Sequence, residues 1–328
     1  MTTMPTFHPA VSASRRALLA GLGVLVGVAT MLPPRRTMAQ VTSILGSPVA
    51  APAAGRYPVQ MQDVVYRQDG AQRWLARVYQ PQGPGPFPTL LDVHGGVWNF
   101  LDRTYDAPMN LALAASGLVV VAIDYRLAPA SPYPASVADV NYATRWLKAH
   151  AADFNGRATH LGGIGGSAGG HLLMLSAMRS HDPRYAALPL PAAPDVDATL
   201  AYLLLLSPIL DPAARYQFAQ QTGRNDLIQA QDAYFGTPAV MQEADPQLIL
   251  DWGEHVALPP TIILQGTADR NVTPAMQERF AAAYRNAGGV IELDEFADEP
   301  HYFANAPGPD TDRALQLLAA FASRYDGG

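Results

Sequence analysis

Residues 165–169 have the sequence GGSAG, a G-x-S-x-G pattern centred on Ser167. The pattern follows an apolar run and opens SAGGHLLMLSAM, which is typical of a helix. In a strained turn between a strand and a helix, small residues on both sides of the serine let the two elements approach and leave the hydroxyl in a cleft. The pattern therefore predicts Ser167 as a nucleophile. A glycine-rich turn in which the serine only caps the helix is the alternative.

A serine hydroxyl attacks poorly without a base, and the base needs an acid that orients it. Asp269 lies just past the apolar run TIILQG, and His301 lies on the loop after VIELDEF. Three such residues in this order, each after its own predicted strand, favour a Ser167–His301–Asp269 triad. Taken singly, Asp269 is compatible with a turn cap and His301 with an ordinary loop histidine. Asp298 and Glu299 are the alternative acids, because they lie close to His301 in the chain.

The stretch LLDVHGGVWNF places two adjacent glycines after another predicted strand. Flexible glycines allow backbone N–H groups to point into a cleft, as the oxyanion of a tetrahedral intermediate requires. Trp98 and Phe100 follow the two glycines closely in the chain, and Tyr302 follows His301. They are candidates to line an apolar acyl pocket, with packing in the core as the alternative.

Other polar residues favour structural roles. Asp124, Tyr125 and Arg126 are predicted to form an ion-pair and hydrogen-bond corner near the glycine pair, and His171 is predicted to be packed rather than catalytic. DWGEH lacks the H-E-x-x-H spacing of a zinc site, and DVD lacks the length of a calcium loop. We therefore expect no metal and no other cofactor.

Short apolar runs must form the frame that positions these residues. The first two predicted strands flank a turn at RQDGA, and most of the others are apolar on successive residues, as strands covered on both faces are. Helical spacing occurs at 135–150, 273–287 and 310–325, the second opening with Thr273 as N-cap and Pro274 at the first helical position. This alternation predicts an α/β fold with a mostly parallel central sheet of about eight strands flanked by helices. The predicted strands are 59–66, 72–79, 87–94, 118–124, 159–165, 199–207, 261–266 and 290–296.

Residues 208–258 contain no convincing strand and several helical or proline-broken pieces. An insertion of this length between two strands predicts a small helical cap over one end of the sheet rather than a plain loop. The cap belongs to a single predicted domain from 58 to 328.

The N-terminal residues predict an export signal over 1–39. Arg15 and Arg16 precede an uncharged apolar run, and Thr37-Met38-Ala39 resembles a small-residue cleavage site. The paired arginines followed by leucines resemble a twin-arginine signal, which indicates a bacterial protein that is periplasmic or secreted. An uncleaved membrane anchor is the alternative, although the run is short for a membrane span and is interrupted by glycine and proline. Residues 40–57, rich in Ala, Pro, Gly and Ser, predict a flexible linker.

The composition excludes several classes of function. The chain has 328 residues, no cysteine and a formal net charge of −6. Without cysteine there is no disulfide, thiol nucleophile or thiolate metal site. The acidic balance argues against a nucleic-acid partner, because phosphate binding requires a basic face. We expect a small-molecule partner and no stable membrane span after signal cleavage.

The segments HGGVW, DYRLAPASPYPAS, GGSAGGH, GTADRNV and PHYF together resemble the α/β-hydrolase esterases of the hormone-sensitive-lipase and BD-FAE type. The resemblance implies Ser167 as nucleophile, His301 as general base and acid, and Asp269 as the acid that orients it. It implies oxyanion donors at the amides of Gly96, Val97 and Ala168, with Gly95 as an alternative to Val97. Val97 stands where lipase-like members often have a third glycine, and Gly166 stands where a larger residue often precedes the serine.

These inferences predict a metal-independent serine hydrolase that cleaves carboxylic esters through an acyl-enzyme. The resemblance to the family implies short or aromatic acyl esters as substrates. An amidase, an arylformamidase or a peptidase on the same fold is one alternative, because the same triad serves all of them. A non-catalytic ligand-binding protein on this fold is an alternative of another class.

Overall fold

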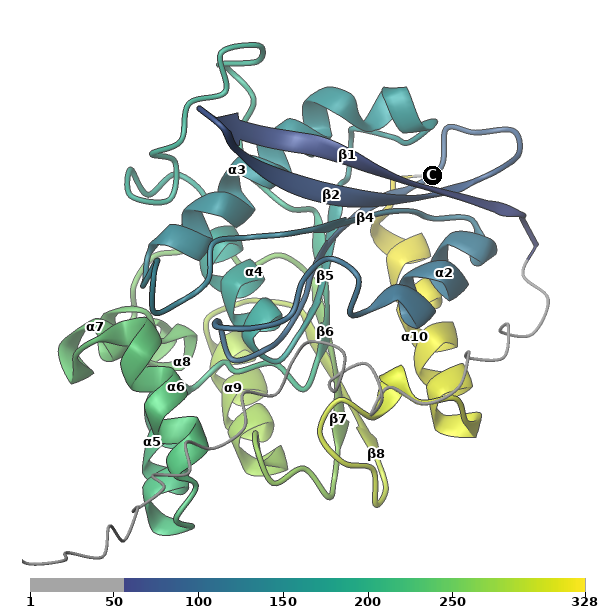
Figure 1. The fold of residues 1–328 in the computed structure, drawn as a ribbon. Coiled ribbons are helices and arrows are strands. Elements are labelled where there is room, and N and C mark those ends of the chain that lie inside the picture. The colour runs from purple at the N-terminus through teal and green to yellow at the C-terminus, as the bar shows by residue number, and fades with distance from the viewer. Residues whose placement is uncertain (1–55, 328) are drawn as a thin grey trace, which may run out of the picture. The chain divides into compact units, whose positions relative to one another are not determined.

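The computed structural model describes residues 56–327, and within them an eight-stranded sheet has the order β1-β2-β4-β3-β5-β6-β7-β8 (Figure 1). The predicted export signal and all of the predicted linker except its last two residues lie outside the described residues. Strand β1 pairs antiparallel with β2 and β2 antiparallel with β4, and every later pair is parallel. The predicted, mostly parallel sheet is confirmed.

All eight predicted strands are present, with ends that differ from the prediction by a few residues. Strands β3, β4, β5, β6 and β7 are buried along their whole length, because helices cover both faces of the sheet. The edge strand β1 is largely exposed. The strands are β1 (Val59–Asp69), β2 (Gln72–Pro81), β3 (Thr89–Val93), β4 (Val119–Ile123), β5 (Gly162–Gly166), β6 (Tyr202–Leu206), β7 (Thr261–Gly266) and β8 (Ile291–Phe296).

Helices form a layer on each face of the sheet. Helices α2 and α10 contact each other on one face, whereas α3 and α4 pack together on the other, the face on which α9 also lies (Figure 1). The sequence did not predict α2, because its residues are apolar on nearly all sides and lack the one-sided pattern of an amphipathic helix. The helices are α2 (Ala107–Ser116), α3 (Ala135–His150), α4 (Ala168–Met178), α9 (Pro274–Asn286) and α10 (Pro309–Tyr325), with short 3₁₀ turns at Ala151–Phe154 and Phe303–Asn305.

Four short helices lie within 208–258, the segment predicted as a cap. Three of them begin with a polar N-cap followed by proline, at Asp211, Thr237 and Asp245. The N-cap side chain accepts a hydrogen bond from the first turn, and proline at the first position has no N–H group that would be left unpaired. The cap helices are α5 (Pro212–Gln221), α6 (Asn225–Phe235), α7 (Pro238–Glu243) and α8 (Pro246–Asp251).

Between residues 56 and 327, no helix is both long and apolar enough to cross a membrane.

Candidate active site

Ser167 lies in the turn between β5 and α4, where its backbone φ of 51° is in the left-handed region. A non-glycine residue in this region is strained and persists only where its surroundings hold it. The close approach of strand and helix explains the glycines around it. A Cβ atom on Gly169 would collide with the carbonyl oxygen of Val93, so α4 packs this closely against β3 only because position 169 is glycine.

The structure brings the three predicted triad residues together. The Nε2 atom of His301 lies 3.1 Å from the Ser167 hydroxyl, and its Nδ1 atom lies 2.7 Å from Oδ2 of Asp269. Ser167 is 4% exposed, so the hydroxyl is shielded from bulk water. The alternative acids, Asp298 and Glu299, make no side-chain hydrogen bond or ion pair with His301 among the described residues.

Asp269 is held as a carboxylate acceptor from several directions. The backbone N–H groups of Asn271 and Val272 donate to Oδ1 at 2.7 and 2.9 Å, and the Gln265 side chain donates to Oδ2 at 3.1 Å. Burial raises the pKa of Asp269, but the hydrogen bonds from His301 and these backbone groups outweigh burial and lower it below its ordinary value. The carboxylate is therefore ionised and oriented toward the imidazole.

The loop after β3, residues 94–101, is the predicted oxyanion loop, and it presents backbone amides beside Ser167. Gly95 lies next to Ser167, because a Cβ atom on Gly95 would lie 3.4 Å from the Cβ atom of Ser167. The hydroxyl of Tyr125 donates to the carbonyls of His94 and Gly95, both at 3.0 Å. In a trans peptide the N–H group points opposite to the carbonyl, so the amides of Gly95 and Gly96 point away from Tyr125. These two amides and that of Ala168 have no backbone acceptor within residues 56–327.

The rest of this loop is backbone under strain. Gly96 has a φ of 95°, and a Cβ atom at this position would collide with the Phe100 carbonyl. Val97, Trp98 and Leu101 also have positive φ values, of 42°, 65° and 75°. Such values are disfavoured for residues with side chains, above all for β-branched valine. Other contacts must therefore hold the loop in this conformation.

A model of the alpha/beta hydrolase fold family matches residues 90–305, a stretch that includes all three triad residues. The chain belongs to this family. It is 32% identical over 264 residues to the carboxylic ester hydrolase LipN of Mycobacterium tuberculosis, covering 76% of this chain and 67% of LipN. It is 27% identical over 252 residues to esterase LipQ of the same organism, covering 76% of this chain but only 58% of LipQ.

A solved structure, esterase B from Lactobacillus rhamnosis, superposes with a TM-score of 0.70 at 19% identity over 88% of this chain and 93% of that chain. At this identity the likeness concerns the fold alone. The predicted α/β-hydrolase fold is confirmed, and the predicted resemblance to BD-FAE enzymes within the family stays a prediction.

Trp98 takes the alternative role that the sequence left open, packing in the core, and it is not among the residues that line the cleft described below. Its side chain is fully buried and stacks on Tyr234 of α6 at 4.8 Å between ring centroids. The indole N–H donates to Nδ1 of His171 at 3.1 Å. His171 therefore carries its proton on Nε2 and donates it to the Ala244 carbonyl at 2.8 Å. These side chains therefore connect the oxyanion loop, helix α4 and the cap. His171 is packed, as predicted.

The Asp124–Arg126 corner also has the predicted structural role. Asp124 accepts from Arg103 at 2.9 Å, and Arg126 donates to the buried carboxylate of Asp139 at 2.9 Å. Together with the Tyr125 contacts described above, these bonds support the oxyanion loop.

Tyr302, another predicted pocket residue, packs against Gly166, which directly precedes Ser167. Its ring occupies the space in which a side chain at Gly166 would lie, so the unusual glycine at 166 matches the large residue at 302. The Tyr302 hydroxyl donates to Asp106 at 3.1 Å. Burial raises the pKa of Asp106 to about 6. Sequence reasoning missed Asp106, because nothing in its local sequence distinguishes it from an exposed loop acid.

A cleft of about 480 Å³ opens between the oxyanion loop and the cap. Phe100, the third predicted pocket residue, is 53% exposed and lines this cleft together with Val97. The other lining residues are Asn99 of the same loop, Asn271 of the loop after β7 that carries Asp269 (the acid loop), and Arg224, Asp226, Leu227, Gln229 and Ala230 of the cap.

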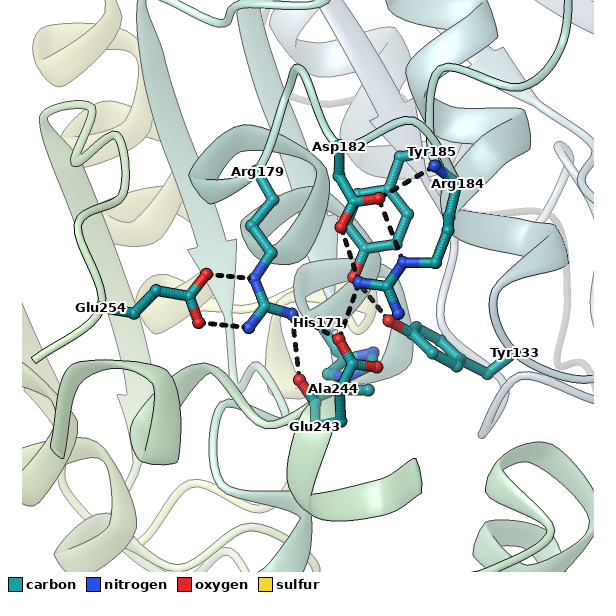
Figure 2. Close-up of polar contacts among 9 residues, drawn as sticks. All are labelled: Tyr133, His171, Arg179, Asp182, Arg184, Tyr185, Glu243, Ala244 and Glu254. Atoms are coloured by element: carbon teal, nitrogen blue, oxygen red, sulfur yellow. Dashed lines mark hydrogen bonds and ion pairs between the residues drawn. The ribbon is translucent and has the colours of Figure 1, made fainter. Parts of the chain in front are cut away.

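The cap is fastened to the body by buried and half-buried polar contacts (Figure 2). Arg179, just after α4, donates to the Glu243 carboxylate at 2.7 Å and pairs with Glu254 at 2.5 Å. Figure 2 also shows the bond from His171 to the Ala244 carbonyl beside them. The C-terminal half of the cap is therefore attached to helix α4, which follows Ser167. In the described part of the chain, no group of three or more His, Asp or Glu side chains is arranged to hold a metal ion.

Proposed function

We propose that this chain is a carboxylic ester hydrolase in which Ser167 is the nucleophile, His301 the general base and acid, and Asp269 the orienting acid. One observation carries the proposal: the hydrogen-bonded series Ser167–His301–Asp269, with contacts of 3.1 and 2.7 Å. Its support is that the base is within hydrogen-bond reach of the nucleophile and is oriented in turn by a third group.

In the proposed reaction, His301 accepts the proton of Ser167 as the hydroxyl attacks the ester carbonyl. The tetrahedral intermediate collapses when the imidazolium protonates the leaving alcohol, and water then hydrolyses the acyl-enzyme by the same proton transfers. The Asp269 carboxylate keeps the imidazole in the required tautomer and stabilises its positive charge.

We assign the oxyanion hole to backbone amides at Gly96, Val97 and Ala168, with Gly95 as the alternative to Val97. The Tyr125 contacts support the Gly95 and Gly96 amides, since they turn both away from Tyr125. Ala168 is supported by its place at the first position of α4, where the amide has no partner within the helix.

The proposed substrates are short or aromatic acyl esters. The cleft supports this assignment through its moderate volume of about 480 Å³. Apolar and amide side chains line it, together with the charged Arg224 and Asp226. A p-nitrophenyl ester series tests it, with activity expected to decline beyond medium chain lengths. A maximum at dodecanoate or longer would overturn the assignment of chain length.

The experiment that tests the reaction compares Ser167→Ala with the matched control Ser176→Ala. Both serines are buried, and Ser176 lies on the helix that Ser167 precedes. We expect Ser167→Ala to abolish turnover of p-nitrophenyl acetate and stoichiometric labelling by an organophosphate, while Ser176→Ala keeps both. Full turnover in Ser167→Ala would refute the proposal, and an anilide rate equal to the ester rate would favour an amidase.

We further propose that residues 1–39 direct export of the enzyme to the periplasm or beyond. The paired arginines and the apolar run support this proposal. Replacing Arg15 and Arg16 with lysine and then fractionating cells tests it, with loss of export as the expected result.

A further inference from the structure

Arg215, on cap helix α5, is a completely buried arginine. The acceptors found for its guanidinium within residues 56–327 are amide oxygens rather than carboxylates. Nε and Nη2 donate to Oδ1 of Asn271 at 2.9 and 2.6 Å, and Nη1 donates to Oε1 of Gln231 at 2.6 Å. A buried charge without an opposite charge in direct contact is costly, so its presence calls for an explanation.

The guanidinium lies where three parts of the proposed active site meet. Asn271, which accepts two of its bonds, donates its backbone N–H to the Asp269 carboxylate at 2.7 Å. The guanidinium carbon lies 6.0 Å from the centroid of the Trp98 ring, in the oxyanion loop. Gln231 belongs to α6, which forms one wall of the cleft.

The charges that face this guanidinium come from two segments. Asp269 of the acid loop favours the charged form, whereas Arg224 and Asp226, at the start of α6, act in opposite directions. Burial lowers the pKa of Arg215 to about 9, and the attraction of Asp269 opposes this shift. Arg215 therefore carries its charge at neutral pH, close to the acid of the triad.

We propose that Arg215 is a positioning residue for the triad: it holds Asn271, and through Asn271 the Asp269 carboxylate, in the geometry that orients His301. The inference rests on the function proposed above. It makes helix α5 of the cap a support of the catalytic acid, whereas α6 of the cap lines the cleft.

Two measurable consequences follow. A loosened acid orients the imidazole less well, and small displacements of catalytic groups lower turnover by up to about 100-fold. The link also depends on the donors of the side chain at position 215. Lysine keeps one charged donor that can reach Asn271, whereas methionine keeps none, so turnover should decrease in the order wild type, Arg215→Lys, Arg215→Met.

The test compares Arg215→Met, Arg215→Lys and the control Arg145→Met in the full chain. Arg145 is also a buried arginine whose bonds go to neutral oxygens, of Asn141 and Leu188, and it lies over a tyrosine ring as Arg215 lies over Trp98. Active-site titration with an organophosphate normalises kcat to folded enzyme. We expect kcat to fall about 10- to 100-fold in Arg215→Met and less in Arg215→Lys, with KM much less affected in both. Arg145→Met should match the wild type in kcat and in KM.

Asn271→Ala keeps Arg215 and removes its acceptor on the acid loop, so it tests the same link if Arg215→Met fails to fold. We expect a fall in kcat in the same direction. Wild-type kcat in Asn271→Ala, or Arg215 variants that behave like Arg145→Met, would overturn the inference. So would equal kcat values in Arg215→Met and Arg215→Lys, because the two side chains are similar in size and a packing role alone would give that result. If instead Ser167→Ala keeps its turnover, the proposed function fails, and the two failures are distinguishable.

Discussion

The imidazole of His301 lies with Nδ1 2.7 Å from Oδ2 of Asp269, although 32 residues separate them in the chain. The two residues follow β7 and β8, which are adjacent parallel strands in register along their whole length. Parallel neighbours end at the same edge of a sheet, so the loops after them meet there. The loop after β5 ends at this edge as well and brings Ser167 to the other side of the imidazole.

Asp269→Asn removes the carboxylate and favours the wrong tautomer of His301. We expect the fold to persist and kcat to fall on the order of 10⁴-fold, by analogy with the effect of the same Asp→Asn substitution on turnover in another Ser-His-Asp triad. The control is Glu299→Gln, which should stay close to wild type because the Glu299 side chain makes no hydrogen bond or ion pair with His301 in the described structure. Steady-state kinetics on p-nitrophenyl acetate decides between the two acids, and the reverse pattern would move the role to Glu299.

Tyr125→Phe removes the hydroxyl that holds the carbonyls of His94 and Gly95. Direct loss of one oxyanion donor costs about 10²–10³ in turnover. Since Tyr125 acts only on the orientation of the donors, we expect a smaller fall in kcat, about tenfold, with little change in KM. Tyr142→Phe on α3 is the control, because no hydrogen bond of its hydroxyl occurs in the described structure. An unchanged kcat in Tyr125→Phe would mean that the loop holds its amides without this support.

Gly166→Ala inserts a methyl group into the space that the Tyr302 ring occupies. Overpacking of this kind destabilises a protein by about 1–3 kcal/mol. Because Tyr302 follows His301 directly, we also expect kcat to fall. Adding Tyr302→Leu, which replaces the ring by a smaller side chain, to Gly166→Ala should recover part of the lost stability. Thermal unfolding and kinetics measure both effects, with Gly308→Ala as the control at an open position. Additive effects of Gly166→Ala and Tyr302→Leu would show that the two residues are not coupled.

His171 makes the stability of the protein depend on pH. Burial lowers its pKa from 6.5 to about 4, so between these values the unfolded chain binds a proton that the folded chain does not. The folded state therefore loses stability as the pH falls from about 6.5 to 4, by about 3 kcal/mol in total from this group. His171→Gln, which keeps a donor and an acceptor, should abolish this component. We expect the unfolding free energy of the wild type minus that of the variant to decrease by that amount as the pH falls from about 6.5 to 4. Urea titrations at about pH 7 and pH 4.5 measure most of this change. A difference that does not depend on pH would contradict the assignment.

Local sequence patterns were sufficient to predict most of the frame. The buried strands are apolar on successive residues, which fits only a sheet covered on both faces, and Thr273-Pro274 marks the start of α9 to the residue. The meeting of Ser167, Asp269 and His301 was also predictable, because each of these residues follows a strand whose end is visible in the sequence. Glycine at 169 follows from the same local turn, in which strand and helix approach too closely for a side chain.

What the sequence could not determine is which side chains meet across long separations. Trp98 is an aromatic residue beside a catalytic loop, and only the packing of α6 against it makes it a buried anchor rather than a pocket wall. Asp106 and Arg215 carry no local signal, since their roles come from Tyr302 and Asn271, which lie 196 and 56 residues further along the chain. Local patterns record backbone preference and one-sided burial, both of which act over a few residues. The partners of a buried charge are chosen by how the cap and the sheet pack together, and that choice exists only in the tertiary structure.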